Sequence, residues 1–342
     1  MNITPRVVFW TTGDVGIGFG HVRRCLSLAE ALRTRDTATT FLLDAGESVV
    51  QYVRQHGFEA IVNSGLGGSP VRSVRQAGGT AVVVDSYTVP TADLRHLQME
   101  FFVAAIDDLA DRELPVDVVV NASPARTRSD YRALSSTQYL LGPAYALLRH
   151  EFNGQLPHDR IREKVGRVLI TVGGSDPNRL TLPLLQWCST LLPGVTLEVI
   201  LGPLFDDALK EEARSIAPAA TYHHDPANMR GLMLQSDLAI CGGGQTIYEL
   251  VATGTPAVAI STALNQVVNL TAFERLGMLD WAGTTSDGRL GDRVSAAIER
   301  LAGDCNRRRR MSERGRSIVD GAGASRVASA LVETFHAANQ NR

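Results

Sequence analysis

A glycine-rich stretch near the start of the chain combines residue types that can bind an anion and transfer a proton. It contains Gly16, Gly18 and Gly20, and His21 follows the last of them directly. Glycine allows positive φ and the close approach of a ligand, and a helix N-terminus offers unpaired N–H groups to an anion. Histidine is the side chain best suited to proton transfer at neutral pH. We therefore predict a ligand-binding loop with His21 as its candidate catalyst.

Tight packing is the alternative explanation for these glycines. Their spacing also differs from the Gly-x-Gly-x-x-Gly fingerprint of dinucleotide-binding turns. The flanking residues indicate where the stretch lies. Val7–Trp10 is an apolar run that predicts a buried strand, and after His21 the apolar residues recur with the spacing of one helical face. The order strand, glycine-rich turn, helix places the stretch at the edge of a sheet.

The rest of the first half alternates short apolar runs with helix-length segments, which predicts a doubly wound parallel sheet of α/β type. The predicted strands are residues 7–10, 38–43, 60–62, 80–84, 101–106, 116–120 and 139–141. Polar residues follow several of these strands, among them Asp85, Tyr87, Asp107 and Asp108. Open α/β sheets bind ligands at this carboxyl edge.

The second half repeats the pattern, with predicted strands at 168–172, 196–201, 221–223, 238–241 and 256–260. Beyond the last of these we expect only helices, at 268–276, at 290–302 and from 309 to the end. The polar stretch 153–166 contains glycine and proline and reads as a linker. We expect one Rossmann-like domain over 1–155 and a second over 165–320. A C-terminal helix over 321–342 could pack back on the first domain.

Composition excludes several classes of function. Hydrophobic residues make up 44% of the 342 residues and the net charge is −2, so no global field attracts nucleic acid or anionic membranes. The four cysteines are far apart and form neither a zinc motif nor a disulfide framework. We see no secretory leader and no run of about 18 to 20 apolar residues that would span a membrane. A cytoplasmic location is the simplest expectation.

Two further glycine-rich turns follow predicted strands in the second half. They are Gly173-Gly174-Ser175 and Gly242–Gln245, and Glu249 lies one helical turn beyond the second. Such turns bind phosphates through backbone N–H groups, and a carboxylate nearby can accept both ribose hydroxyls. Packing alone could also explain the glycines, but together with the carboxylate they favour a nucleoside diphosphate.

The motifs resemble those of a known family. Gly16–Ala29 is similar to the N-terminal motif of the UDP-sugar hydrolases of pseudaminic-acid biosynthesis, which release a 2,4-diacetamido-trideoxy sugar from UDP. The similarity spans roughly residues 7 to 280. It continues through Val84–Tyr87, Ile106–Arg112, Leu141–Arg149, Val172–Pro177, Asn228-Met229 and Asn265-Gln266. Spore-coat polysaccharide proteins and, more distantly, a lipid II-forming N-acetylglucosaminyltransferase belong to the same group. The resemblance implies the glycosyltransferase-B fold, with two Rossmann-like domains facing a central cleft.

The resemblance also implies roles for individual residues. His21 matches the histidine thought to activate the attacking water. Tyr87 and Asn265 match polar residues that line the sugar site, and Gln266 adjoins them. Gly18, Gly20 and Asp14 of the glycine-rich stretch are further candidates for sugar binding, and Asp14 could instead orient His21 or stabilise the turn. The matches for nucleotide binding are Gly173, Gly174, Ser175, Met229, Gly243, Gly244, Gln245 and Glu249. The first domain would hold the sugar and the catalytic histidine, and the second the nucleotide. The implied reaction needs no metal and no cofactor.

Three functions stay open at this point. The leading hypothesis is hydrolysis of a UDP-sugar at its anomeric C–O bond by base-activated water. A glycosyltransferase with an organic acceptor would use the same residues, and a nucleotide-sugar-binding protein without turnover would keep only the binding sites. Asp85, Asp107 and Asp108 could bind a metal, but capping and turn-stabilising roles are more common for such carboxylates. The identity of the sugar and the oligomeric state are not predicted.

Overall fold

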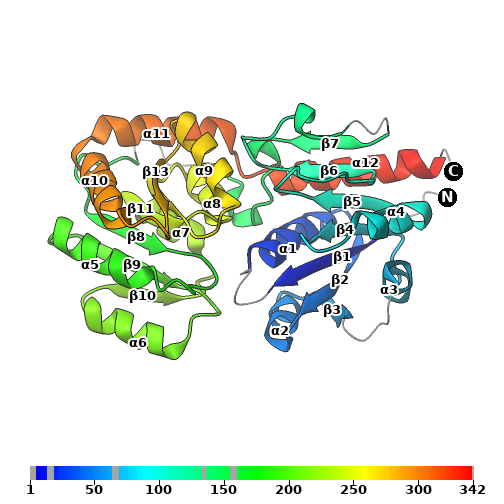
Figure 1. Cartoon of the computed structure of the whole chain (residues 1–342), viewed down its shortest axis with the longest axis horizontal. Helices are drawn as coiled ribbons and strands as arrows, with labels where there is room; N and C mark the ends of the chain where they lie inside the picture. The colour runs from blue at the N-terminus through cyan, green and yellow to red at the C-terminus, as the bar shows by residue number, and fades with distance from the viewer. Residues whose placement is uncertain (1–4, 14–18, 64–68, 133–135, 155–159, 341–342) are drawn as a thin grey trace. The chain divides into compact units, whose positions relative to one another are not determined.

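The computed structural model describes residues 5–13, 19–63, 69–132, 136–154 and 160–340. The chain forms two compact units. Unit 1 consists of residues 1–150 and 321–342, and unit 2 of residues 151–320. Each unit is a parallel sheet with helices packed on it (Figure 1). In the part of the chain that the structure describes, no helix is both long and apolar enough to cross a bilayer.

The sheet of unit 1 has seven parallel strands in the order β3-β2-β1-β4-β5-β6-β7. Their bounds are β1 Arg6–Gly13, β2 Ala38–Ala45, β3 Glu59–Val62, β4 Ala81–Asp85, β5 Phe102–Ile106, β6 Val118–Asn121 and β7 Gln138–Leu141. The central strands are runs of β-branched and aromatic residues, and every residue of β4 and β5 is buried. Such two-sided burial is what a parallel sheet with helices on both faces requires.

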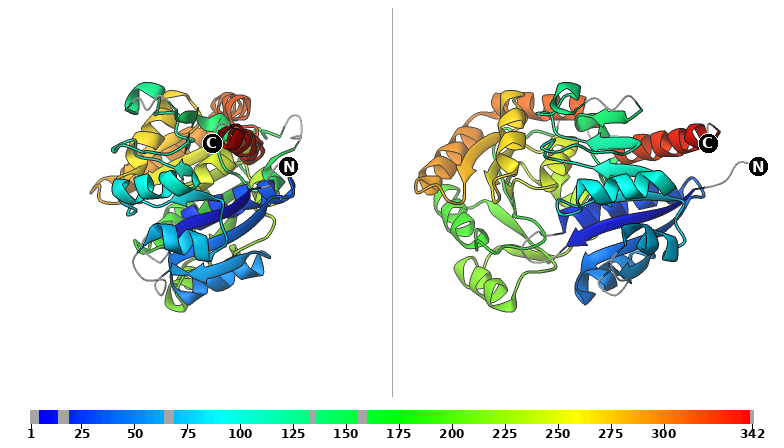
Figure 2. Two further views of the ribbon diagram at one scale, coloured as in Figure 1. Left: turned by 90° about the vertical axis from the view of Figure 1, so that its right-hand side faces the viewer. Right: turned by 45° about the vertical axis from the view of Figure 1, so that its right-hand side comes forward.

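The helices of unit 1 are α1 Gly20–Arg33, α2 Glu47–Gln55, α3 Pro70–Gln76, α4 Thr91–Glu100 and α12 Gly323–Gln340. Short 3₁₀ turns lie at Arg128–Asp130, Pro143–Tyr145 and, at the unit boundary, His150–Phe152. Helix α12 packs against α1, and Figure 2 shows it running along the first unit's sheet. Its buried residues, which include Val327, Leu331 and Phe335, recur at helical spacing and form one apolar face.

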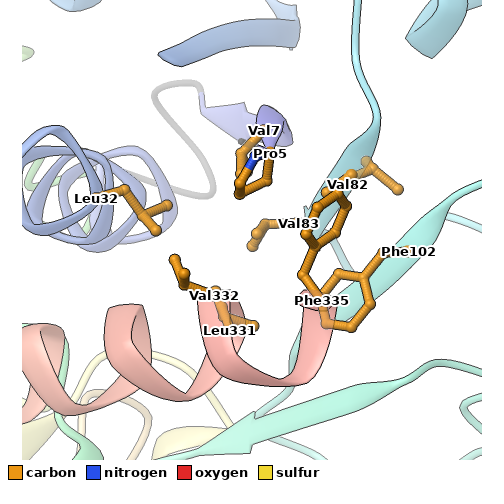
Figure 3. A pocket seen from close by; sticks show the side chains of 10 residues that line it. Pro5, Val7, Leu32, Val82, Val83, Phe102, Leu331, Val332 and Phe335 are labelled. Atoms are coloured by element: carbon orange, nitrogen blue, oxygen red, sulfur yellow. The ribbon is translucent and has the colours of Figure 1, made fainter. Parts of the chain in front are cut away.

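Two contacts hold α12 on unit 1. Figure 3 shows apolar side chains of Leu331, Val332 and Phe335 around a small pocket that Leu32 of α1 and Phe102 of β5 also line. At the start of the helix, a Cβ on Gly323 would lie 2.2 Å from the carbonyl oxygen of Ala146. Only glycine permits this close approach.

Unit 2 has six parallel strands in the order β10-β9-β8-β11-β12-β13. Their bounds are β8 Arg167–Thr171, β9 Thr196–Leu201, β10 Thr221–His224, β11 Leu238–Gly242, β12 Ala257–Ser261 and β13 Asp280–Thr284. The helices are α5 Thr181–Leu191, α6 Asp207–Ile216, α7 Met229–Gln235, α8 Thr246–Thr253, α9 Gln266–Arg275, α10 Leu290–Gly303 and α11 Cys305–Ile318. The two sheets confirm the predicted α/β class with two Rossmann-like folds.

One expectation about the last part of the chain was wrong. Strand β13 lies where we expected only helices. Its sequence contains Gly283, at φ 115°, and lacks the apolar run of an ordinary buried strand, and its pairing with β12 is interrupted by a register shift. The part from 309 to the end, which we expected to be helical, contains the end of α11 and all of α12. They are separated at Gly321, which has φ 80°.

In both units the strand order reverses at one point, between β1 and β4 in unit 1 and between β8 and β11 in unit 2. Open α/β sheets bind ligands outside the carboxyl ends of the strands at such a reversal. In unit 1, the glycine-rich stretch follows β1 and Asp85 ends β4. In unit 2, Gly173 follows β8 closely and Gly242 ends β11. The topology therefore places Gly13 and Asp85 at the reversal point of the first sheet, and Gly173 and Gly242 at that of the second.

Candidate functional site

His21 lies in the first turn of α1 and is buried. Its ring nitrogen Nδ1 lies 2.6 Å from Oδ1 of Asp85, the last residue of β4. An ionised carboxylate only accepts hydrogen bonds. In the neutral imidazole, Nδ1 therefore carries the proton and donates a hydrogen bond to Asp85. Nε2 is then the acceptor, as a general base requires. The pair is a histidine oriented by a carboxylate.

Arg24 joins two carboxylates beside this pair. Its Nε and Nη2 donate to the two oxygens of Asp85 at 2.7 and 2.6 Å, and its Nη1 donates to Asp108 Oδ1 at 2.8 Å. The guanidinium side chain is only 11% exposed and that of Asp85 is fully buried. The Arg24 guanidinium is thus bound to two carboxylates and does not lie on a solvated helix face.

Tyr87 completes the group. Its hydroxyl donates to Asp108 Oδ2 at 2.6 Å, and its ring meets the His21 ring edge to face, with 4.7 Å between centroids. The loops that carry Tyr87 and Asp108 are tied together by Arg112, which donates to the backbone carbonyls of Ser86 and Val89. His21, Arg24, Asp85, Tyr87 and Asp108 thus form one connected cluster, which we call the His21 cluster.

Charge pairing sets the protonation states in the His21 cluster. Burial alone would raise the pKa of Asp85, but the Arg24 guanidinium and His21 hold it well below its usual range. Burial opposes the ionisation of Asp108 as well, and Arg24 again lowers its pKa. Burial and the neighbouring Asp108 carboxylate raise the pKa of Tyr87 well above its usual value. At neutral pH the cluster therefore holds two carboxylates, one guanidinium and a protonated tyrosine.

Asp107 belongs to a different network. Its Oδ2 accepts from the Tyr131 hydroxyl at 2.7 Å, and Asn121 Nδ2 donates to the same hydroxyl at 2.8 Å. All three side chains are buried. Asp107 also accepts from the backbone N–H of Ala110, so its carboxylate stabilises a turn. Among the described residues, no group of three or more His, Cys, Asp or Glu side chains is arranged to hold a metal ion.

In unit 2, the first glycine-rich turn is shaped by the backbone. Gly173 has φ 122°, where other residues would be strained, and a Cβ on Gly202 would lie 2.4 Å from the Gly173 carbonyl oxygen. Ser175 is partly exposed in this turn. Asp176 accepts from the backbone N–H groups of Leu180 and Thr181, both at 2.8 Å, and so caps the start of α5.

The second turn, before α8, is different. A Cβ on Gly242 would lie 2.6 Å from the Val172 carbonyl oxygen, so this glycine serves packing between β11 and the end of β8. A Cβ on Gly244 would meet nothing within 4 Å, and Gly244 is exposed. The side chain of Gln245 does not cap the first N–H groups of α8. The first turn of this helix contains the buried carboxylate Glu249.

The structure brings some of the remaining predicted residues together. Gln266 is the first residue of α9, and its Oε1 accepts a hydrogen bond from the backbone N–H of Thr262. The same oxygen lies 2.7 Å from the position that a Cβ on Gly243 would take. Asn265 directly precedes α9. Met229 is the buried first residue of α7. The predicted residues Asp14 and Gly18 lie outside the described residues.

Arg24 and Asp108 have no predicted role in sugar binding or catalysis. Both occur in motifs that resemble those of the UDP-sugar hydrolases, Arg24 in the stretch after His21 and Asp108 in the pair of aspartates after β5. The missing information was which residues meet across the sheet, since Arg24 and Asp108 are 84 positions apart.

Several solved structures share this fold. MurG of Acinetobacter baumannii matches 96% of this chain and 100% of its own, with a TM-score of 0.66 and 15% identity. LpCGTa, solved with UDP, matches 97% of this chain and 99% of its own, with a TM-score of 0.65 and 13% identity. The fold is the glycosyltransferase-B fold. This confirms the fold class that the sequence resemblance implied.

No family model matches the sequence. Among curated proteins, SpsG of Bacillus subtilis, a spore coat polysaccharide biosynthesis protein, is 24% identical over 343 residues, which cover 96% of this chain and 98% of SpsG. The UDP-2,4-diacetamido-2,4,6-trideoxy-beta-L-altropyranose hydrolase of Campylobacter jejuni is 23% identical over 80% of this chain and 97% of its own. The chain is therefore a distant relative of SpsG and of the UDP-sugar hydrolases, as predicted.

An uncharacterised protein of Methanocaldococcus jannaschii is 27% identical over 272 residues. The match covers 75% of this chain but only 55% of the archaeal protein. The chain thus spans about half the length of that relative.

Proposed function

We propose that this protein is a nucleotide-sugar hydrolase that cleaves the anomeric C–O bond of a UDP-sugar. His21 would take a proton from the attacking water, and free sugar and UDP would be the products. The observation that carries the proposal is the hydrogen bond from His21 Nδ1 to the buried Asp85, because it leaves Nε2 as the acceptor. The distant relationship to UDP-sugar hydrolases supports the reaction type.

The nucleotide would bind on unit 2. The turn at Gly243 and Gly244, followed by the N-terminus of α8, offers backbone N–H groups to a diphosphate. In this proposal Glu249 accepts the ribose hydroxyls, and Gly173, Gly174, Ser175, Gln245 and Met229 complete the nucleotide site. Tyr87, Asn265, Gln266, Gly20, Gly18 and Asp14 would contact the sugar.

The proposed chemistry is a single displacement by water, which inverts the configuration at the anomeric carbon. The water oxygen forms the new bond to the anomeric carbon, the bond to the UDP oxygen breaks, and its electron pair leaves with UDP. One water proton passes to His21 Nε2. Asp85 stabilises the imidazolium that forms, and helix N-terminal N–H groups stabilise the charge on the departing diphosphate.

The test is UDP release from a panel of UDP-sugars without acceptor or metal, in ¹⁸O-labelled water. Release of UDP, with the label in the free sugar, supports the proposal. His21→Ala should lower turnover by about 10²–10⁴-fold, the usual contribution of a general base, while UDP affinity holds. Glu249→Ala should instead weaken UDP binding. Turnover that survives His21→Ala unchanged contradicts the assigned base.

UDP binding without release would favour the other two hypotheses. A glycosyltransferase would then release UDP only when an alcohol acceptor is added, with His21 taking the acceptor's proton. A binding protein would release none under either condition.

A further inference from the structure

We propose that Arg24 is a positioning residue that makes both His21 and Tyr87 hydrogen-bond acceptors toward the ligand, so that the site prefers water over an alcohol as nucleophile. The inference rests on the proposed hydrolase function for the nucleophile. The part that concerns hydrogen-bond direction rests only on the geometry of the His21 cluster.

Arg24 is placed to control both residues at once. It follows His21 by three positions on α1, so the two side chains lie on the same helical face. Two of its donors bind Asp85, which holds His21, and a third binds Asp108, which holds Tyr87. The planar guanidinium presents its donors in a fixed fork, and a lysine ammonium lacks that geometry.

The direction of each hydrogen bond follows from the charges. The Arg24 guanidinium helps to keep Asp85 and Asp108 ionised, and an ionised carboxylate only accepts. The His21 Nδ1–H and the Tyr87 O–H must therefore point at their carboxylates, over 2.6 Å in each case. Arg24 Nη2 also lies 3.2 Å from His21 Nδ1, but this nitrogen carries its own proton and does not accept.

Both groups then act as acceptors toward a ligand. The single O–H of Tyr87 donates its hydrogen bond to Asp108, so a ligand can only donate to the hydroxyl oxygen, as it would to Nε2 of His21. The two rings are neighbours at 4.7 Å between centroids. Water has two protons and satisfies both acceptors while a lone pair stays available for the anomeric carbon. An alcohol has one O–H and satisfies only one of them.

The first test changes the direction of the Tyr87 hydrogen bond. In Asp108→Asn, the amide N–H can donate to the Tyr87 oxygen, so the hydroxyl proton is free to donate to the ligand. We would measure hydrolysis and methanolysis of the same UDP-sugar in aqueous methanol, from the ratio of free sugar to methyl glycoside. This ratio is taken within one sample, so a loss of folded protein does not change it.

We expect almost only free sugar from the wild type, and at least a fivefold higher share of methyl glycoside from Asp108→Asn, with UDP affinity unchanged. Asp111→Asn is the matched control, since it is an exposed aspartate three positions further along, and its product ratio should equal that of the wild type. An Asp108→Asn ratio equal to the wild-type ratio would overturn the preference for water.

The second test does not depend on activity. The ¹⁵N chemical shifts of the His21 ring report which nitrogen carries the proton, with assignment from a His21→Gln spectrum. We expect the Nδ1–H form in the wild type and in Arg33→Lys, an exposed arginine on the same helix. In Arg24→Lys we expect a mixture of the two tautomers.

The two tests distinguish a failure of the positioning role of Arg24 from a failure of the proposed function. An unchanged Nδ1–H tautomer in Arg24→Lys would overturn the positioning role. A wild type that releases no UDP from any UDP-sugar would overturn the proposed function, and the NMR result would still decide the role of Arg24.

Discussion

At the scale of single residues, the His21 cluster links a candidate base to a carboxylate that has no exposure to solvent. A buried charge is stable only when it is paired and hydrogen-bonded. Asp85 meets this condition with His21 and Arg24. The cost of burying the carboxylate is thus offset by the partners whose orientation it sets.

Replacing Asp85 by asparagine should separate orientation from binding. In Asp85→Asn the amide can donate to Nδ1, which moves the imidazole proton to Nε2 and removes the base. We expect turnover to fall by about 10²–10⁴-fold, with UDP affinity within twofold of the wild type, measured by steady-state kinetics and calorimetry. A turnover equal to that of the wild type would remove Asp85 from the mechanism.

The lowered pKa of the two carboxylates predicts how stability depends on pH. Asp85 and Asp108 titrate below the ordinary aspartate value of about 3.9 in the folded protein. Their contribution to the free energy of unfolding is complete above that value, and it is lost as the pH falls through it toward the folded pKa. Urea unfolding at a series of pH values should show this loss in the wild type.

Asp108→Asn should show a shallower loss of stability in acid, because one of the two titrating carboxylates is gone. Asp111→Asn, with its exposed side chain, should follow the wild-type curve. Parallel curves for all three proteins would contradict the assigned pKa of Asp108.

At the scale of elements, the glycines of unit 2 divide into two kinds. Gly242 and Gly202 are required because neighbouring backbone atoms leave no room for a Cβ, and Gly173 because of its φ. Gly244 has neither reason, since a Cβ there meets nothing within 4 Å. A glycine with open space before a helix N-terminus is the arrangement expected where a phosphate approaches the backbone.

Gly244→Ala should therefore fold normally and bind UDP more weakly. We expect a loss of about 1–3 kcal/mol, the usual cost of an added methyl group in an occupied space, which is about a tenfold to hundredfold increase in the Kd for UDP. Gly303→Ala is the matched control, since its Cβ also meets nothing within 4 Å. Isothermal titration with UDP and thermal unfolding of both variants would check this, and unchanged affinity in Gly244→Ala would contradict the diphosphate site.

At the scale of the whole molecule, each unit completes its own core, but unit 1 does so with two separate parts of the chain. Helix α12 returns to α1 and β5 after the chain has built all of unit 2. Phe335 is 3% exposed, and its ring meets that of Phe102 edge to face, with 5.8 Å between centroids. Arg35 adds hydrogen bonds to Ser325 and Ser329.

Phe335→Ala should destabilise unit 1 and leave unit 2 unaffected. We expect a loss of about 3–5 kcal/mol, as is usual when a buried phenylalanine is truncated. Hydrogen exchange should accelerate in peptides from β4 and β5 but not in peptides from β8 and β11. Glu333→Ala, at an exposed position on the same helix, is the control. Equal acceleration in both units would show that they do not unfold separately.

The sequence by itself determined the alternation of strands and helices, because apolar runs and helical spacing are local patterns that survive any tertiary arrangement. It also placed His21 after a glycine-rich turn and identified the motifs shared with the relatives. The sequence did not predict β13, because residues 280–284 include Gly283 and do not form an apolar run. That strand exists because β12 offers it an edge for pairing.

Only the tertiary structure decided which charges meet. Arg24 follows the pattern of an exposed helix residue, whereas Asp85 ends β4 and Asp108 lies in the loop after β5. The strand order makes them neighbours, since β4 lies between β1 and β5 in the sheet. Spatial proximity across a parallel sheet depends on strand order, and no local pattern in the sequence encodes it. The orientation of His21 by Asp85, and the proposed role of Arg24, therefore depend on the fold.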